Sequence, residues 1–417
     1  MEGKVKLGNR LVVVGAGAAG FFCAVNAARI NPHLQVTIVE KSSKLLSKVK
    51  VSGGGRCNVT HACFEIDQMI RRYPRGERFL KSAFHHFFTT DTIRWFEERG
   101  VKLKAEADGR MFPVTDSSQT IIDCLLKEAN TYKVQVLMNR EVKAIKSSDG
   151  QFSLSFANGE IIKADFVCIA CGGYPKSTMF EWIENLGHTI EEPLPSLFTF
   201  NMPGNPITSL MGVVAEEVKI KIIGSKLQET GPLLITHWGM SGPAVLKLSA
   251  WGARELAQKN WKFSILINWL ANHTEQTLKL LFQEWRLSKA STRIWSKNEL
   301  GLPNRLWEFL LNKSGVHESL RWADLPGKNQ QLLINHVCAF QCEVNGKTTF
   351  KEEFVTAGGV KLKEVDPSTM MSKLVEGVFF AGEILDVDGI TGGFNFQHAW
   401  TSGFIAAKTI GEICGDS

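Results

Sequence analysis

The stretch that most restricts the fold of this chain spans residues 10–40. A first apolar run is followed by the glycine-rich segment GAGAAG, an alanine-rich run typical of a helix, and a second apolar run. In this Gly-x-Gly-x-x-Gly pattern, Gly15 permits a tight turn, Gly17 a close approach to a pyrophosphate, and Gly20 close packing of a helix on the strand. Glu40 ends the second apolar run, twenty residues after Gly20, where a carboxylate can accept ribose hydroxyls. The pattern predicts an α/β dinucleotide-binding fold with a parallel sheet.

Residues 139–173 distinguish between NAD and FAD as the dinucleotide. They predict three short strands, with turns at Asp149–Gly150 and Asn158–Gly159, and a fourth strand leading into Gly172–Gly173. Residues 377–413 predict a last strand, a Gly-Glu turn and a glycine-rich start to a final helix. This is the layout of a glutathione-reductase-like FAD domain. We therefore expect tightly bound FAD, with NADH or NADPH as a transient reductant, because the sequence has no second Gly-x-Gly-x-x-Gly motif.

Residues 52–58, SGGGRCN, place three consecutive glycines where a helix or strand would gain nothing from them. We expect this loop to run beneath a flavin, because backbone without Cβ atoms can approach a ring system and offer N–H groups to anions. Lys48 and Arg56 are expected to supply positive charge near a phosphate or a reduced flavin. Cys57 is interpreted as a packed or flavin-adjacent thiol, with a redox pair to Cys63 as the less favoured alternative.

Six segments spread over nearly the whole chain carry a family resemblance: GAGAAG (15–20), SGGGRCNVT (52–60), LGH (186–188), THWGMSGPAVL (236–246), VTAGGV (355–360) and FAGEILDVDGITGGFNFQHAW (380–400). They are similar to the BaiN/YhiN-type flavoproteins, which are NAD(P)/FAD-dependent, aminoacetone-oxidase-like oxidoreductases. Residues 174–182 and Cys171 depart from the family pattern. The motifs and the resemblance together imply cofactor contacts at Gly15, Gly17, Ala18, Ala19, Gly20, Glu40, Lys41, Lys48, Ser52, Gly53, Gly54, Gly55, Arg56, Cys57, Asn58, Val142, Ala170, Cys171, Gly172, Gly382, Glu383, Gly389, Gly392, Gly393, Phe394 and Asn395.

The middle of the chain is expected to interrupt the FAD domain, which then comprises residues 1–190 and 355–417. Residues 191–271 and 340–354 predict a β-barrel-like subdomain, because the segments 194–203, 213–224 and 231–250 alternate like strands. Residues 272–339 predict a helical subdomain, with helices in 275–287 and 304–315 and a C-cap at Gly315.

The segment THWGMSGP, residues 236–243, is the best candidate for a loop that reaches the flavin from this insert. His237 is the candidate for proton movement and Ser241 for a hydrogen bond to substrate or ring edge. A structural role for His237 is the stronger alternative. No metal-ligand spacing stands out in the sequence.

Composition limits the setting and leaves three alternatives open. Nine cysteines at scattered spacings fit a reducing cytosol, and the uncharged residues 11–28 are the glycine turn and its helix rather than a membrane span. We expect hydride transfer between FAD and a small substrate, linked to NAD(P)H. The alternatives are an amine oxidase that uses O2, a tRNA-modifying flavoenzyme suggested by the net charge of +6 and the basic run 71–81, and a non-catalytic flavin-binding module. Nucleic acid is the less favoured partner, and the oligomeric state is left open.

Overall fold

The computed structural model describes residues 9–148, 150–296, 298–349 and 355–415. The chain forms two compact units, the first made of Met1–Ser196 and Lys351–Ser417 and the second of Leu197–Phe350. Asp149 of the predicted Asp149–Gly150 turn lies outside the described residues, as do residues 350–354 at the predicted boundary of the insert. Among the described residues no helix is both long and apolar enough to cross a membrane.

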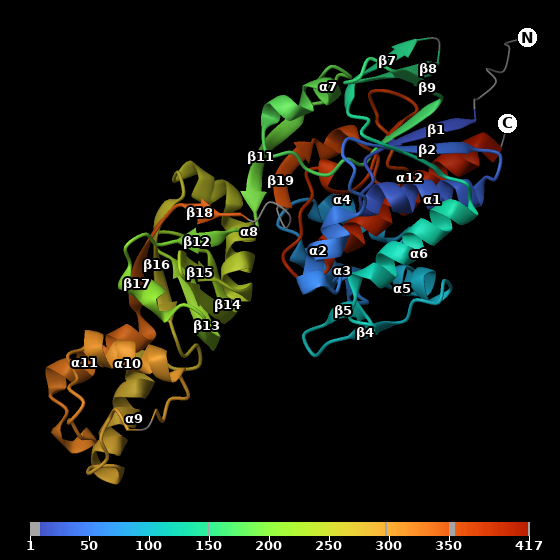
Figure 1. Ribbon diagram of the computed structural model, residues 1–417. Coiled ribbons are helices and arrows are strands. Elements are labelled where there is room, and N and C mark those ends of the chain that lie inside the picture. The colour runs from blue at the N-terminus through green and yellow to red at the C-terminus, as the bar shows by residue number, and fades with distance from the viewer. Residues whose placement is uncertain (1–8, 149, 297, 350–354, 416–417) are drawn as a thin grey trace, which may run out of the picture. The chain divides into compact units, whose positions relative to one another are not determined.

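The first unit is built on a five-stranded parallel sheet whose central strands are buried. Its order is β20-β10-β1-β2-β6, and every pairing is parallel. The strands are β1 (Arg10–Val14), β2 (Gln35–Glu40), β6 (Gln135–Met138), β10 (Phe166–Ile169) and β20 (Val378–Phe380). Helices α1 (Ala18–Ile30) and α12 (Phe394–Gly415) pack side by side beneath the sheet in the view of Figure 1, and α6 (Ser118–Thr131) lies next to α1. The predicted Rossmann-type FAD fold is confirmed.

Smaller elements surround this sheet and place the loops of the candidate site. The predicted meander is present as the antiparallel β7 (Val142–Ser148), β8 (Gln151–Phe156) and β9 (Ile161–Ala164). A second three-stranded sheet contains β3 (Thr60–His61), β5 (Arg110–Pro113) and β4 (Leu103–Ala105). The remaining elements are α2 (Ser47–Gly55), α3 (Ile66–Met69), α4 (Glu77–Phe84), α5 (Thr89–Glu97), α7 (Glu181–Glu184), β11 (Ile190–Ser196) and β19 (Val355–Val360).

The second unit is a curved antiparallel sheet covered by helices. Its strand order is β17-β16-β13-β14-β15-β12-β18, and β17 and β18 are separated in the chain only by Gly346, so the sheet returns on itself like a barrel. The strands are β12 (Thr199–Asn201), β13 (Val214–Ile222), β14 (Gln228–Thr236), β15 (Gly239–Ser241), β16 (Lys262–Asn268), β17 (Phe340–Asn345) and β18 (Lys347–Thr348). The helices are α8 (Pro243–Gln258), α9 (Glu275–Ser288), α10 (Asn304–Lys313) and α11 (Gly327–Cys338).

Three expectations for the middle of the chain change. Residues 243–250, the end of the strand-like segment 231–250, belong instead to α8, because Pro243 occupies the first helical turn and the buried residues recur at helical spacing. The boundary at 190/191 moves to 196/197, because β11 pairs with β19 inside the first unit. The strand and helical parts, predicted as separate subdomains, share one hydrophobic core that includes Ile220, Leu278 and Leu333.

Candidate functional site

The glycines in the turn between β1 and α1 have different roles, as the surroundings of an added Cβ atom at each position show. At Gly20 this atom would lie 1.9 Å from the carbonyl oxygen of Gly15, so only glycine lets α1 begin so close to the turn. At Gly17, which is extended, it would meet no described atom within 4 Å. The N–H groups that open α1 have no partner within the helix, and they adjoin this space with the positive end of the helix dipole. The arrangement fits a pyrophosphate.

Glu40 ends β2 and turns its carboxylate toward the same turn. One carboxylate oxygen accepts a hydrogen bond from the N–H of Ala16 at 3.0 Å, and the other accepts from the N–H and hydroxyl of Ser42 at 3.0 and 2.9 Å. The oxygen that accepts from Ala16 keeps lone-pair capacity for a ribose hydroxyl. The ammonium of the next residue, Lys41, lies over the ring of Tyr174, 5.4 Å from its centre. Glu40 is therefore fixed in place before any ligand is considered.

The three glycines of the SGGGRCN segment form the end of α2, but the backbone is not helical at Ser52, Gly53 and Gly54. Gly53, Gly54 and Gly55 have φ values of 58°, 69° and 85°. An added Cβ at Gly53 would lie 2.8 Å from the ring of Phe112, whereas at Gly54 and Gly55 it would meet no described atom within 4 Å. The loop thus packs through Gly53 and presents bare backbone to open space at the next two residues, as a flavin-contacting loop must.

Cys57 lies directly behind this loop and is fully buried. Burial raises the pKa of its thiol to about 12, against the opposing hydrogen bond with Ser52. Burial also raises the pKa of the Cys63 thiol, and both cysteines are free. Because the thiolate is the reactive form, these environments favour a packed thiol at Cys57 over a dithiol relay.

The glycine-rich turn that opens α12 meets the segment after the three glycines. Asn395 closes the turn by accepting from the N–H of Gly389 at 2.8 Å and donating to its carbonyl at 2.9 Å. An added Cβ at Gly393 would lie 2.4 Å from the carbonyl oxygen of Thr60. In the orientation that satisfies both ends of its amide, Asn58 accepts from the N–H of Gly393 and donates to the carbonyl of Thr60, each at 3.0 Å. The fold thus joins two predicted cofactor loops from opposite ends of the chain.

Two side chains that the sequence did not single out support Phe394, the first residue of α12. The ring of His61 stacks on Phe394 with 4.7 Å between the ring centres, and its Nδ1 lies 3.0 Å from the carbonyl oxygen of Gly392. The buried hydroxyl of Tyr73 donates to the carbonyl of Phe394 at 2.7 Å. The only local signal was the position of His61 at the end of the SGGGRCNVTH run.

Lys48 and Glu383, both predicted cofactor contacts, form an ion pair at 2.5 Å. The other carboxylate oxygen of Glu383 accepts from the N–H of Thr356 at 2.9 Å. The neighbouring Gly382 carbonyl lies 3.1 Å from Nε2 of the buried His398. Burial lowers the pKa of His398 to about 4, so the neutral ring donates this bond at pH 7. Because Lys48 is paired with Glu383, its charge is shared with a protein carboxylate.

Asp388 precedes the second glycine turn and is fully buried. Its carboxylate receives Nε and Nη2 of Arg75 and, at 2.7 Å, the hydroxyl of Ser196. Burial raises the pKa of Asp388 above its ordinary value, and the bonds from Arg75 and Ser196 oppose that rise. Arg75 belongs to the basic run 71–81, which suggested a nucleic-acid partner. It is instead an internal partner, which weakens that run as a docking surface.

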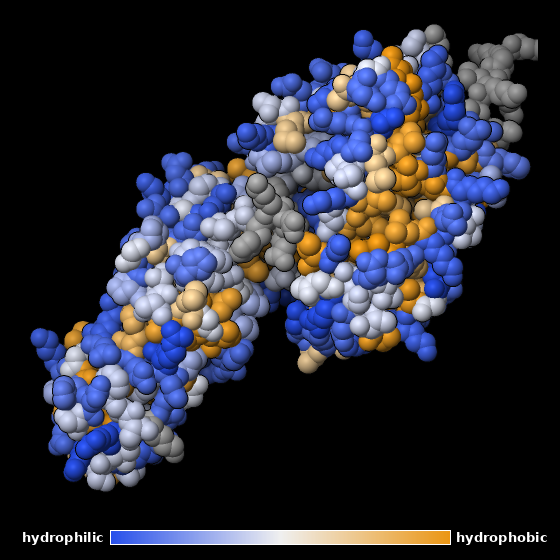
Figure 2. All heavy atoms as spheres, in the orientation of Figure 1, coloured by the Kyte–Doolittle hydropathy of each residue, from blue (hydrophilic) through white to orange (hydrophobic). Residues whose placement is uncertain are grey.

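Of the other predicted contacts, Ala170 and Cys171 lie against the first glycine turn, where an added Cβ at Gly15 would lie 2.6 Å from the carbonyl oxygen of Ala170 and 2.5 Å from Cα of Cys171. Val142 is buried at the start of β7, and the N–H of Ala170 donates to the carbonyl of Val14 at 2.8 Å. At Gly172 an added Cβ would lie 3.9 Å from a carboxylate oxygen of Glu383. In the view of Figure 2, apolar side chains form a broad area on the surface of this unit, which is typical of a ligand site.

His237 and Ser241 belong to the second unit. His237 is exposed in the turn between β14 and β15, with its ring edge-on to Trp238 at 4.4 Å between ring centres, and Ser241 is half-buried at the end of β15. The contacts described above all lie within the first unit. The catalytic roles of His237 and Ser241 stay predictions.

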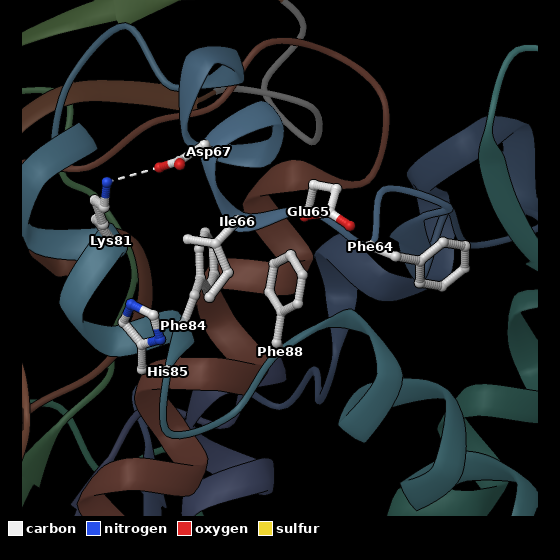
Figure 3. A pocket seen from close by; sticks show the side chains of 8 residues that line it. All are labelled: Phe64, Glu65, Ile66, Asp67, Lys81, Phe84, His85 and Phe88. Carbon is white, nitrogen blue, oxygen red and sulfur yellow. Dashed lines mark ion pairs between the residues drawn. The ribbon is translucent and has the colours of Figure 1, made fainter.

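A pocket of about 400 Å³ lies elsewhere on the first unit (Figure 3). It opens between α3 and α4, and an ion pair at 2.7 Å between Lys81 and Asp67 spans one side. Its lining residues are Phe64, Glu65, Ile66, Asp67, Lys81, Phe84, His85 and Phe88. None of them is a predicted cofactor contact, so this pocket is separate from the two glycine turns.

The parallel sheet with its inserted meander defines a Rossmann-type cofactor domain, the kind of domain found in FAD-dependent oxidoreductases. The chain belongs to the HI0933-like family, whose model, described as the HI0933-like protein Rossmann domain, matches residues 9–409. The resemblance predicted from the six sequence segments is thereby confirmed.

Individual relatives match along nearly their full lengths. The 3-dehydro-bile acid delta(4,6)-reductase of Clostridium scindens is 27% identical over 413 residues, covering 97% of this chain and 99% of the relative. A ribosomal RNA dihydrouridine synthase of Escherichia coli is 30% identical over 409 residues, covering 96% of this chain and 97% of the relative. The 3-ketosteroid-delta4-(5alpha)-dehydrogenase of Rhodococcus jostii RHA1 is similar in structure, with a TM-score of 0.51 at 13% identity and coverage of 97% and 98%. That last likeness shows a shared fold alone.

Proposed function

We propose that this protein is a reductase that uses FAD to reduce a carbon–carbon double bond conjugated to a carbonyl group, with NADH or NADPH as the electron source. The observation that carries the proposal is the end-to-end match to two relatives. Their names describe reduction of a dienone in a bile acid and of the uracil ring in RNA. Both are double bonds made electron-poor by a carbonyl, so the shared chemistry is broader than either substrate.

The residues of this chain have binding and orienting roles in the proposed reaction. The open N-terminus of α1 and the backbone at Gly54 and Gly55 would hold the cofactor, and Glu40 would hold its ribose. Bound FAD supplies hydride transfer between nicotinamide and substrate. The N-terminus of α12, fixed by Tyr73 and Asn395, offers a positive dipole end where negative charge develops. Such chemistry depends on position and electrostatics more than on a dedicated acid–base pair.

The test is turnover with a panel of acceptors under anaerobic conditions. Purified protein with NADPH or NADH should consume nicotinamide when given an enone such as a 3-oxo-4-ene steroid, and mass spectrometry should find the former double bond saturated. The corresponding saturated ketone is the matched control and should not be consumed. Oxidation of aminoacetone with O2, without enone reduction, would instead establish the amine oxidase alternative.

Uridine in RNA is the second candidate substrate, and one charge feature favours it. Residues 197–350 contain 17 Lys and Arg against 11 Asp and Glu, so the second unit carries the whole formal net charge of +6. A basic unit attached to a neutral one suits a polyanionic substrate. The relevant experiment measures dihydrouridine in ribosomal RNA from cells that lack this protein. Loss of the modification, restored by the wild-type chain, supports this candidate, and unchanged dihydrouridine content removes it.

A further inference from the structure

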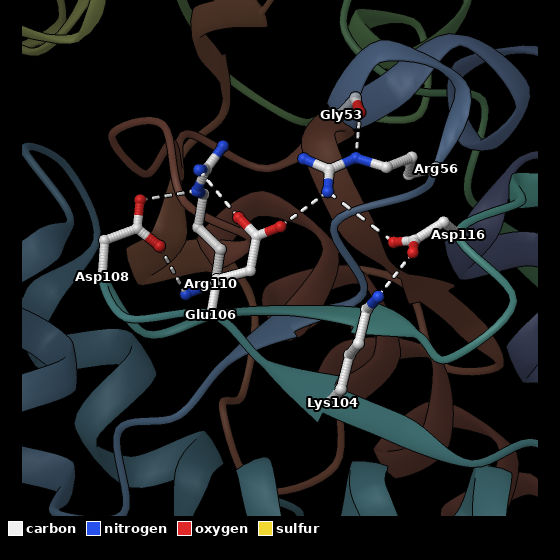
Figure 4. Close-up of polar contacts among 7 residues, drawn as sticks. All are labelled: Gly53, Arg56, Lys104, Glu106, Asp108, Arg110 and Asp116. Carbon is white, nitrogen blue, oxygen red and sulfur yellow. Dashed lines mark hydrogen bonds and ion pairs between the residues drawn. The ribbon is translucent and has the colours of Figure 1, made fainter.

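Arg56 follows the three glycines and folds back onto them. Its Nε donates to the carbonyl oxygen of Gly53 at 3.4 Å (Figure 4). Its guanidinium lies over the ring of Phe112, 3.9 Å from the ring centre. The same buried ring limits the space at Gly53, where an added Cβ would lie 2.8 Å from Cε1. Arg56 therefore holds the carbonyl group of Gly53, and Phe112 packs against the position where a Cβ atom would be.

The charge of Arg56 is balanced by carboxylates near β4 and β5. Nη1 of Arg56 lies 2.6 Å from Glu106 and 3.7 Å from Asp116 (Figure 4). The second oxygen of Glu106 binds Arg110 at 2.9 Å, and Asp116 binds Lys104 at 2.5 Å. The Lys104 hydrogen bond lowers the pKa of Asp116, so this carboxylate stays charged. The full cluster has three cations and three carboxylates: Arg56, Lys104, Arg110, Glu106, Asp108 and Asp116.

The loop needs such an anchor because its own residues do not select one conformation. Gly53, Gly54 and Gly55 all have positive φ, and Cys57 follows at 61°. Glycine visits this region readily but also many others, and a non-glycine residue there costs roughly 1 kcal/mol. A run of this kind persists only where its surroundings determine it. Within the loop the N–H of Cys57 donates to the carbonyl of Ser52 at 3.0 Å. The first side chain after the glycines that can reach back is Arg56.

We propose that Arg56 is a positioning residue: anchored by Glu106, Asp116 and Phe112, it holds Gly53–Gly55 in the left-handed form that leaves Gly54 and Gly55 open to the cofactor. The proposal rests on FAD binding at this loop and not on the identity of the reduced substrate. It replaces the expectation that Arg56 offers its charge to a phosphate or flavin. In the positioning role the carboxylate partner matters as much as the arginine.

The test compares Arg56→Gln and Glu106→Gln by the dissociation constant for FAD, measured from flavin fluorescence on dilution of the holoprotein. We expect both variants to weaken FAD binding by about tenfold, and the double variant to be no worse than either single change. Hydrogen exchange of a peptide that covers residues 50–58 should be faster in both. If Arg56 bound the cofactor directly, the two variants would change FAD affinity in opposite directions. Arg56→Gln would weaken binding, whereas Glu106→Gln, by removing a negative charge, would tighten binding of the anionic cofactor.

Two further variants keep the result interpretable. Arg94→Gln removes an exposed cation of the same unit, paired with Asp91 and outside the cluster around Arg56, and its FAD affinity should stay within about twofold of wild type. Arg56→Lys keeps the charge but loses the planar stack on Phe112, and should bind FAD as weakly as Arg56→Gln. The proposal is overturned if Glu106→Gln tightens FAD binding or if Arg56→Lys restores it. It is equally overturned if Arg56→Gln lowers the melting temperature while leaving FAD affinity unchanged.

Discussion

At the first glycine turn, substitutions of Gly17 and Gly20 should have different effects, because the space at their Cβ positions differs. Gly17→Val adds atoms where the protein has none, with a backbone conformation that valine adopts readily. We expect stability without FAD to change by less than about 0.5 kcal/mol, and FAD affinity to fall by at least about tenfold. Gly20→Ala, in contact with Gly15, should cost about 2 kcal/mol of stability instead. Urea unfolding and FAD titration separate the two effects. Wild-type affinity in Gly17→Val would contradict the assignment of the pyrophosphate to this turn.

His398 predicts a pH dependence of stability with a definite sign. Burial lowers its pKa to about 4 from an ordinary value of 6.5, so between these pH values the unfolded chain binds a proton that the folded chain does not. The free energy of unfolding should therefore fall as the pH drops from 6.5 to 4, by roughly 3 kcal/mol from this residue. His398→Gln keeps a donor for the Gly382 carbonyl and should lose less stability over this range in urea unfolding. Parallel curves for wild type and variant would refute the assignment.

At the scale of elements, a largely buried ion pair is one of the contacts that join the segment before α4 to the turn before α12. Asp388→Asn leaves the guanidinium of Arg75 buried without its counter-charge, and should cost about 3 kcal/mol in the free energy of unfolding. Arg75→Met combined with Asp388→Leu removes both charges and should recover much of that loss. Chemical denaturation of the three proteins tests this. If the double variant is no more stable than Asp388→Asn, the pair does not act as a unit.

Sequence patterns correctly predicted those turns, strands and helix ends that are determined by residues close together in the sequence. The turn at Gly15–Gly20, the meander strands and the C-cap at Gly315, which has a φ of 66°, follow from spacing and turn residues. Helix α8 was missed because its apolar residues follow directly on real strands, and the alternation was extended across Pro243. The Gly-Pro step was the available signal.

The contacts between loops could not be predicted in the same way. Arg75 pairs with Asp388 and Lys48 with Glu383 across more than 300 residues of sequence, and spacing carries no information about such partners. Arg56 was assigned to the cofactor because it follows three glycines, whereas its partners come from the separate hairpin of β4 and β5. Sequence patterns thus indicated which loops matter, and the tertiary fold determined what each side chain holds.

At the scale of the whole molecule, the division into two units predicts where FAD stabilises the chain. With FAD at about one hundred times its dissociation constant, the first unit should gain about 2.7 kcal/mol by mass action. Hydrogen exchange of holoprotein and FAD-depleted protein should show slower exchange in peptides from residues 10–60 and 378–400, and unchanged exchange in α9–α11. Equal protection of α9–α11 would mean that the second unit also takes part in cofactor binding.

The most direct test of the proposed chemistry follows the two half-reactions of the flavin separately in the absence of oxygen. Holoprotein is mixed with NADPH or NADH, and the reduced protein is then mixed with a 3-oxo-4-ene steroid while the visible flavin band is recorded. A conjugated-alkene reductase should lose the band with a nicotinamide and regain it with the enone, leaving an equal amount of saturated ketone. If aminoacetone bleaches the flavin and neither nicotinamide does, or if the enone fails to restore the band, the proposal is wrong.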